Sequence, residues 1–247
     1  EAFVKRMNER AAELGMCNTN FENVTGLDDS TTKHLTSAYD IALMSQALLR
    51  HPKILEYSTI WMDTIRDGAF GLTNTNRLIR FYEGATGLKT GSTSKAGFCM
   101  SATAMRDGMH LIAVVMGADT RDIRNETAKQ LLDYGFANYS LYRDEGGDAG
   151  VTSVIGGTKR EVNTAYRPYC ALLGKGKNKT IQKEILLDEK CPAPIAKGDR
   201  IGTVRYLSDG NVVEERPIEA AEDVPKITFG GLLLRMLGIV TMKTAGT

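Results

Sequence analysis

Two short apolar runs separated by one turn constrain the fold of this chain more than any other stretch. "GFCMSATAM" (97–105) and "HLIAVVMG" (110–117) both have strand character, and the "RDG" near 106–108 is typical of a tight turn. The pattern predicts an antiparallel hairpin at the centre of a sheet. Apolar residues at helical spacing precede and follow it. The fold class we expect is therefore α/β (α+β), an antiparallel sheet with flanking helices.

Two of the expected helices have recognisable start signals. Ser37 with Asp40 three residues later resembles a capping box, and Thr120 is a suitable cap for a helix over about 121–138. The apolar spacing of that second helix predicts which side chains face the core. They are Ile123, Leu131 and Tyr134.

The character of the sequence changes near residue 144. "DEGGDAG" reads as a linker, and the following residues are short apolar runs punctuated by "GG", "CPAP" and "SDGN". Such spacing predicts a small all-β, sandwich-like domain over 144–226, with a hairpin formed by "RIGTVRYL" and "VVEERPI". The segment 227–247 is apolar but interrupted by Arg235, and is shorter than the roughly 20 residues that cross a bilayer. It either lies in a membrane interface or packs as a helix on the β domain.

Composition excludes several classes of function. Lys and Arg number 31 against 30 Asp and Glu, a net charge of +1, so no nucleic acid partner is expected. Zinc-finger spacing, a phosphate-binding loop and a dinucleotide fingerprint are all missing from the sequence, so we expect neither a metal nor a cofactor. The four cysteines are widely spaced. We expect buried free thiols, although Cys170 and Cys191 stay open as a possible pair.

The segment "GLKTGST" (87–93) is the candidate binding site. Lys89 offers a point charge for a carboxylate, Thr90 a directed hydroxyl, and Gly91 a backbone that another chain can approach closely. This combination suits a peptide that ends in a carboxylate. The tripeptide alone is weak evidence, because roughly one chain in twenty of this length contains it by chance.

Two arginines in the first turn of the expected 121–138 helix add to this hypothesis. Positive charge there opposes the helix dipole, so an arginine in that place often binds an anion instead. For Arg121 a solvent-facing side chain paired with Asp119, Asp122 or Glu126 is the favoured interpretation. For Arg124 the two readings stay balanced.

Several segments, in this order, resemble D-alanyl-D-alanine carboxypeptidases, the low-molecular-mass penicillin-binding proteins. They are "EAFVKRMNERAAELGM", "TGLDD", "SAYDIALMSQALLR", "GLKTGST", "AGFCMSATAMRDGMHLIAVVMGA" and "LLDYGF". The resemblance implies part of a penicillin-binding, β-lactamase-like transpeptidase domain over 1–143, a β-rich domain over 144–226 and a membrane-anchoring amphipathic segment over 227–247. It also implies an extracytoplasmic location, peripheral on the outer face of the bacterial cytoplasmic membrane.

The same resemblance implies a chemistry and a set of roles. A serine attacks the carbonyl between two terminal D-alanines of a peptidoglycan stem peptide, and water hydrolyses the acyl-enzyme. Lys89 would be the catalytic group that sets the electrostatics of the cleft, and Thr90 would bind the terminal carboxylate on a strand that continues through Gly91. The backbone N–H of Ser92 would be one oxyanion donor, and Arg124 would support carboxylate recognition. β-Lactams would acylate the same serine.

The chain departs from the family pattern in one respect. The family carries S-x-x-K and S-x-N before K-T-G, and only K-T-G is present in its expected place. "STTK" (30–33) and "STSK" (92–95) match S-x-x-K only as letters, one in a turn-rich loop and the other overlapping the K-T-G strand. We therefore expect the nucleophile upstream of Glu1 and this chain to be inactive alone. A β-lactamase-like hydrolase and a non-catalytic wall-binding protein stay open as alternatives.

Overall fold

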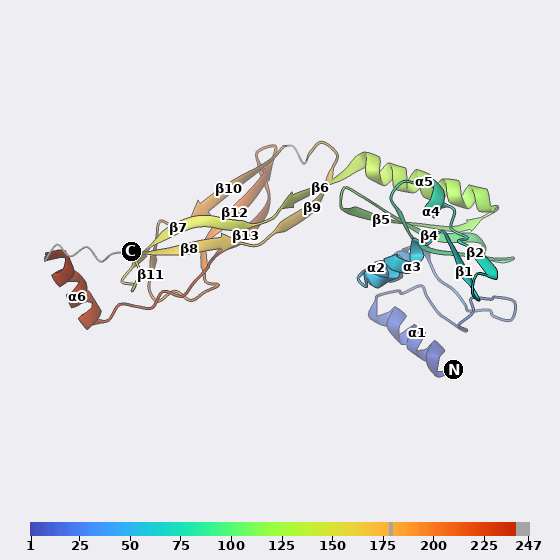
Figure 1. Ribbon diagram of the computed structural model, residues 1–247, viewed down its shortest axis with the longest axis horizontal. Helices are drawn as coiled ribbons and strands as arrows, with labels where there is room; N and C mark the ends of the chain where they lie inside the picture. The colour runs from blue at the N-terminus through green and yellow to red at the C-terminus, as the bar shows by residue number, and fades with distance from the viewer. Residues whose placement is uncertain (178–179, 241–247) are drawn as a thin grey trace. The chain divides into compact units, whose positions relative to one another are not determined.

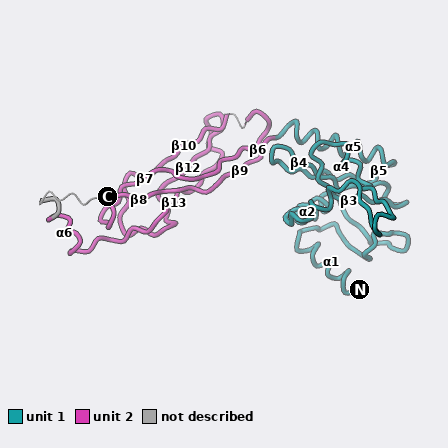
Figure 2. The backbone as a smooth tube through the Cα atoms, viewed as in Figure 1, with its two compact units in different colours: residues 1–139 teal, residues 140–247 magenta. Residues whose placement is uncertain are grey.

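The chain forms two compact units, residues Glu1–Tyr139 and Ser140–Thr247 (Figure 2). The structure is a computed structural model that describes residues 1–177 and 180–240, without the side chains of 238–240. Each unit has its own strands and its own buried core, so each is described by itself.

The first unit is built around a three-stranded antiparallel sheet in the order β3 (Ala85–Thr93), β4 (Gly97–Arg106) and β5 (Met109–Ala118). β4 and β5 form the hairpin predicted from their sequence. Asp107 and Gly108 make its turn with φ angles of 49° and 72°. This left-handed conformation suits the Asp-Gly pair, and it matches the twist of the two strands.

Helices and a small hairpin surround this sheet (Figure 1). Two predicted caps are confirmed, because Ser37 Oγ accepts the Asp40 N–H at 3.1 Å and Thr120 Oγ1 accepts the Ile123 N–H at 3.1 Å. The elements are α1 (Ala2–Glu13), α2 (Ala38–Leu49), α3 (Lys53–Ser58), β1 (Met62–Ile65), β2 (Phe70–Thr73), α4 (Leu78–Phe81) and α5 (Arg121–Asn138).

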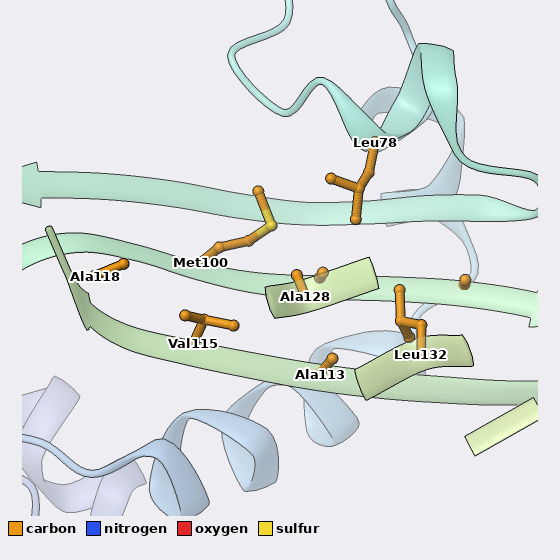
Figure 3. Close-up of a cluster of buried hydrophobic side chains, with 9 residues drawn as sticks. Leu78, Met100, Ala113, Val115, Ala118, Ala128 and Leu132 are labelled. Atoms are coloured by element: carbon orange, nitrogen blue, oxygen red, sulfur yellow. The ribbon is translucent and has the colours of Figure 1, made fainter. Parts of the chain in front are cut away.

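The core of the first unit lies between the sheet and helices α4 and α5 (Figure 3). Met100 from β4 and Val115 from β5 pack there with Leu78 of α4 and with Ala128 and Leu132 of α5. Because successive strand residues alternate between faces, the neighbours of Met100 point to the opposite side of the sheet. There the Ser101 hydroxyl bonds the Ser45 hydroxyl of α2 at 2.7 Å.

The predicted buried face of α5 is wrong. Ile123, Leu131 and Tyr134 are 49%, 46% and 62% exposed, and the buried face instead carries Arg124, Asn125, Ala128 and Leu132. On the face of α5 that packs against the sheet, the first two buried residues, Arg124 and Asn125, are polar. A pattern that counts only large apolar side chains therefore selects the wrong side.

The second unit consists almost entirely of strands. A six-stranded sheet has the order β10-β12-β13-β8-β7-β11, and β6 pairs with β9 in a second sheet. The predicted hairpin is β12–β13, closed by Asp209 and Gly210 at φ angles of 52° and 80°. The elements are β6 (Tyr139–Asp144), β7 (Gly147–Ile155), β8 (Glu161–Tyr166), β9 (Tyr169–Gly174), β10 (Ile181–Leu187), β11 (Lys190–Pro192), β12 (Arg200–Ser208), β13 (Asn211–Ala220) and α6 (Phe229–Val240).

A buried ionic cluster lies in the second unit. Asp144, whose side chain is 8% exposed, accepts Lys183 Nζ at 2.9 Å, Tyr206 Oη at 3.1 Å and Tyr166 Oη at 3.2 Å. Burial alone would raise the pKa of Asp144, but the hydrogen bonds from Lys183, Gly146 and Tyr206 outweigh it and leave that pKa below its usual value. The Tyr166 and Asp144 hydrogen bonds raise the pKa of Lys183. Both groups are therefore charged at neutral pH.

Helix α6 is tied to the second unit by its one arginine. Arg235 donates to the carbonyl oxygens of Thr158 at 2.8 Å and Gly157 at 3.4 Å, while Phe229, Leu234 and other apolar side chains are exposed. No helix in the described part of the chain is both long and apolar enough to cross a bilayer. Residues 241–247 of the expected anchoring segment lie outside the described residues.

All four cysteines are free thiols. Cys191 is buried as expected. Cys17 and Cys170 are exposed, so the expectation of buried thiols is wrong for these two. Cys17 follows α1, and Cys170 is in β9.

Candidate active site

Strand β3, at one end of the three-stranded sheet, carries the residues singled out from the sequence. Thr90 is buried and its hydroxyl lies 2.6 Å from the hydroxyl of Thr75. Lys89 is exposed, and its Nζ donates to the carbonyl oxygen of Thr90. A Cβ placed on Gly91 would meet no atom within 4 Å, so the space beside the strand is open there. Ser92 follows and is exposed.

The alternation of the strand distributes these groups over both sides of β3. Lys89 pairs with Ser101, which faces α2, whereas Thr90 pairs with Met100, which faces α5. Since β3 is the last strand of its sheet among the described residues, groups on both faces can be reached from its edge. An ammonium and a hydroxyl are thus available to one ligand lying along this edge.

Arg124 lies on the buried side of α5 and is 3% exposed. Its Nε and Nη2 donate to Oδ1 of Asn125 at 3.2 and 2.9 Å, and its Nη1 lies 3.5 Å from the carbonyl oxygen of Cys99. Cys99 is the register partner of Gly91, so the guanidinium lies one strand away from the K-T-G segment. Arg124 therefore contacts the strand that pairs directly with the K-T-G segment.

The electrostatics of Arg124 are unusual. Burial, and then the charge of Arg121, lower its pKa. No carboxylate lies within ion-pair distance of it in the described part of the chain. A buried cation without a counter-charge is costly, and binding an anion removes much of that cost. This arrangement suits the anion-binding reading of Arg124.

Arg121 differs from its neighbour. It is exposed, and within residues 1–177 and 180–240 it forms no ion pair. Two of the three carboxylates expected beside it have other partners: Asp122 pairs with Arg77 at 3.5 Å and Glu126 with Lys129 at 3.7 Å. The solvent-facing part of the favoured reading is confirmed, and the pairing is wrong.

A pocket of about 730 Å³ runs along β3. Lys89, Thr90 and Gly91 line it, together with residues of the 26–36 loop and apolar side chains of α2. Asp28 fixes that loop to the β3–β4 turn, because Thr93 Oγ1 donates to its carboxylate at 2.5 Å and Lys95 Nζ to its carbonyl oxygen at 2.5 Å. The loop therefore forms a wall of the pocket.

Neither S-x-x-K letter match lies at the start of a helix. Ser30 is in the 26–36 loop, and Ser92 is in β3 with Lys95 in the following turn. Because Ser92 lies in a strand and Lys95 in a turn, the two are not one helical turn apart, as the resemblance requires of the nucleophile and its lysine. Lys95 Nζ instead donates to the carbonyl oxygen of Asp28.

Three residues of the site were not predicted from the sequence. Thr75 and Asn125 hold Thr90 and Arg124, and Asp28 holds the loop. The only signal for Asn125 is its place beside Arg124 in the first turn of α5. Thr75 and Asp28 come from segments distant in sequence, and their contacts exist only in the folded chain.

The site thus combines a buried arginine with a neighbouring strand that carries a lysine, a threonine and a glycine. Residues 1–120 match the family model of D-alanyl-D-alanine carboxypeptidases, and residues 144–226 match that of the C-terminal domain of penicillin-binding protein 5. The chain belongs to the D-alanyl-D-alanine carboxypeptidases, the low-molecular-mass penicillin-binding proteins.

Individual proteins agree with the family models. The carboxypeptidase DacF of Bacillus subtilis (strain 168) is 40% identical over 96% of this chain and 62% of its own length. DacC of Escherichia coli (strain K12) is 33% identical over 98% and 60%. The crystal structure of penicillin binding protein 5 from Haemophilus influenzae aligns with a TM-score of 0.68 at 31% identity, covering 91% of this chain and 66% of that one. The chain thus spans about 60% of the length of these curated relatives.

Proposed function

We propose that the protein to which this chain belongs is a serine-type D-alanyl-D-alanine carboxypeptidase, and that the chain supplies the wall that binds the end of the substrate. The substrate would be a peptidoglycan stem pentapeptide ending in D-Ala-D-Ala. The observation that carries the proposal is Arg124, a buried cation without a carboxylate partner among the described residues, beside the strand of Lys89 and Thr90.

Each group has a role that its chemistry supports. Thr75 can donate its hydroxyl hydrogen to Thr90, which leaves the Thr90 hydrogen free to bond the terminal carboxylate. Arg124 adds positive charge behind that carboxylate. Lys89 is the catalytic cation of the cleft, and it favours negative charge developing on the attacked carbonyl and on groups nearby. The open side of Gly91 leaves room for the peptide backbone, and the N–H of Ser92 is an oxyanion donor.

The proposed reaction has two steps, acylation of the serine and hydrolysis of the acyl-enzyme. A serine oxygen, supplied from outside this chain, attacks the carbonyl carbon of the penultimate D-alanine, and the peptide bond breaks as the terminal D-alanine leaves with a proton on its nitrogen. Water then attacks the ester, releases the shortened peptide and restores the serine hydroxyl. The residues of this chain bind the carboxylate and orient the peptide in both steps.

β-Lactam antibiotics are the second ligand class of the proposed site. A β-lactam carries a carboxylate beside a reactive amide, so the same cation and hydroxyl groups can orient it. Penicillin-binding protein D2 from Listeria monocytogenes, whose crystal structures include cefotaxime-bound and ampicillin-bound forms, is 37% identical over 54% of this chain with a TM-score of 0.51.

A membrane surface is the proposed partner of α6. Phe229, Leu234 and Met236 are 83%, 71% and 58% exposed, while Arg235 is held by the second unit. A helix with a free apolar side and a tethered charged residue suits the interface of a bilayer better than a span. The protein would then work outside the cytoplasm, peripheral on the outer face of the bacterial cytoplasmic membrane.

Acylation by a fluorescent penicillin tests the enzymatic proposal. The complete protein should form a stable covalent adduct, and the isolated 247-residue chain should form none. An adduct on Ser30 or Ser92 of the isolated chain would contradict the proposed origin of the nucleophile. Failure of the complete protein to be labelled, or to release D-alanine from a D-Ala-D-Ala peptide, would refute the proposed activity.

A further inference from the structure

A second pocket in the first unit is not used by the proposed reaction. It has a volume of about 740 Å³ and shares no lining residue with the pocket along β3. Its walls come from the end of β2, the segment 73–78, α4 and the first turns of α5, elements that are labelled in Figure 1. Trp61 and Phe81 are its aromatic residues.

The two aromatic rings form one apolar wall. The Trp61 and Phe81 rings meet edge to face with centroids 5.9 Å apart and an interplanar angle of 72°. Phe81 is 67% exposed although its helix has a buried side that carries Leu78. An exposed ring beside a half-buried indole provides an apolar surface that a ligand can cover.

Polar groups of the same pocket offer hydrogen bonds but little net charge. Arg77 pairs with Asp122 and Lys129 with Glu126, so only the charge of Arg121 is left without a carboxylate among the described residues. A nearly balanced set of charges argues against a strongly anionic ligand such as a phosphate polymer.

Asn125 supplies a donor with no partner. The residue is 7% exposed and lines this pocket, and its Oδ1 is occupied by Arg124. Its Nδ2 forms no hydrogen bond with any described residue. Nδ2 is not one of the fully buried, unpaired polar atoms of the described residues, so solvent reaches it in the pocket. A ligand carbonyl or hydroxyl can therefore replace water as its acceptor.

We propose that this pocket binds a pyranose unit of a neutral, N-acetylated glycan. The apolar face of the sugar would cover the Trp61 and Phe81 rings, and Asn125 Nδ2 would donate to the acetamido carbonyl or to a hydroxyl. Only the biological source of the glycan, the sugar strand of the cell wall, rests on the proposed function. The pocket is thus a second subsite for the same polymer.

Two residues, Thr75 and Asn125, connect this subsite to the proposed carboxylate site through hydrogen bonds. Thr75 lines the pocket and bonds Thr90, and Asn125 lines the pocket and holds Arg124. A glycan and a peptide end would therefore lie on opposite sides of one set of side chains. Since the sugar lies beyond the carboxylate, it would belong to a glycan strand neighbouring the one that bears the bound peptide.

Tryptophan fluorescence provides the test, because Trp61 is the single tryptophan of the chain. Titration of the 247-residue chain with the tetrasaccharide of N-acetylglucosamine should give a saturable change in emission. Phe81→Ala should weaken binding by about tenfold or more, and Phe81→Tyr should retain it, since stacking depends on the ring. Phe70→Ala, a matched control that is also exposed but does not line the pocket, should bind like the wild type.

Several results would overturn the inference. They are a titration without saturation by a chain whose circular dichroism is native, equal binding by Phe81→Ala, and preference for a sulfated oligosaccharide over the neutral one. If a glucose tetrasaccharide bound with the same affinity as the N-acetylglucosamine tetrasaccharide, the acetamido group would not be recognised, and the proposed ligand class would be wrong. The assay needs no catalysis, so its failure leaves penicillin labelling of the complete protein unaffected, and the two proposals fail separately.

Discussion

The positive charge of Arg124 lies in a part of the first unit where no carboxylate of the described residues is within ion-pair distance. Its guanidinium is held by an amide oxygen and lies near a backbone carbonyl, and both are neutral acceptors. Such partners fix the orientation of the group without cancelling its charge. In the proposed function Arg124 would therefore bind an anion at low reorganisation cost, the property expected of a substrate-binding cation.

Thr90 gives a prediction at the residue scale. Thr90→Val keeps the size of a buried side chain but removes its hydroxyl. In the complete protein, losing a hydrogen bond to a carboxylate should cost about 1.5–3 kcal/mol, roughly a tenfold to hundredfold fall in kcat/KM for a D-Ala-D-Ala peptide. Steady-state kinetics measures this. Thr64→Val, on the exposed strand β1, is the control, and an unchanged kcat/KM in Thr90→Val would contradict the role.

Individual residues also show how far the sequence was informative. The caps at Ser37 and Thr120 were predictable, because a cap depends on residues within three positions. The buried face of α5 was not, since Arg124 and Asn125 occupy core-side positions that periodicity assigns to apolar residues. The dipole argument identified Arg124 as a candidate anion ligand for a reason independent of burial.

At the scale of elements, Asp28 joins the 26–36 loop to the turn between β3 and β4. Its carboxylate accepts Thr93 Oγ1, and its backbone carbonyl accepts Lys95 Nζ. The loop has no regular secondary structure over most of its length. Its position beside Lys89 and Thr90 depends on these two contacts, together with the hydrogen bonds that Asn20 and Glu22 make to residues 32–35.

Asp28→Ala should loosen that wall. In the complete protein we expect KM for a D-Ala-D-Ala peptide to rise about threefold to tenfold, since the loss of one short hydrogen bond costs about 1 kcal/mol, while kcat changes less. Asp29→Ala, on an exposed neighbour, is the matched control. A fall in kcat at constant KM would show that the loop does not act through binding.

Turn chemistry explains which elements were predictable. The Asp-Gly pairs at 107–108 and 209–210 marked both long hairpins correctly. The same "RDG" letters occur at 66–68, where Arg66, Asp67 and Gly68 all have positive φ and close β1 onto β2. That hairpin was missed because its strands are four residues long and exposed on both faces, so they lack the alternation that identifies a strand.

On the scale of the whole molecule, the two units have separate cores. The core of the first unit includes Met100 and Leu132, and those of the second include Val162 and Tyr206. Two units that share no core predict two unfolding transitions. The ionic cluster of Asp144 belongs only to the second.

Asp144→Asn should lower one of the two transitions. The side chain of Lys183 is 34% exposed and can be hydrated once its partner is replaced, so the expected cost is that of charge-assisted hydrogen bonds, about 1.5–3 kcal/mol. Because the pKa of Asp144 is depressed in the folded chain, its contribution is fully present above the unfolded pKa and is lost as pH falls through the folded value. Calorimetry at neutral pH should show the loss, which should shrink in acid. Asp148→Asn is the exposed control, and a loss independent of pH would contradict the account.

The most direct test of the central claim compares two substrates in the complete protein, one ending in the D-alanine carboxylate and the other in its amide. We predict that the wild type prefers the carboxylate, and that Arg124→Gln loses about tenfold or more of that preference, because the charge-assisted interaction exists only with the first substrate. Arg80→Gln, an exposed arginine of α4, should keep the preference. If Arg124→Gln discriminates between the two peptides as the wild type does, the site does not recognise the acidic end of a peptide through Arg124.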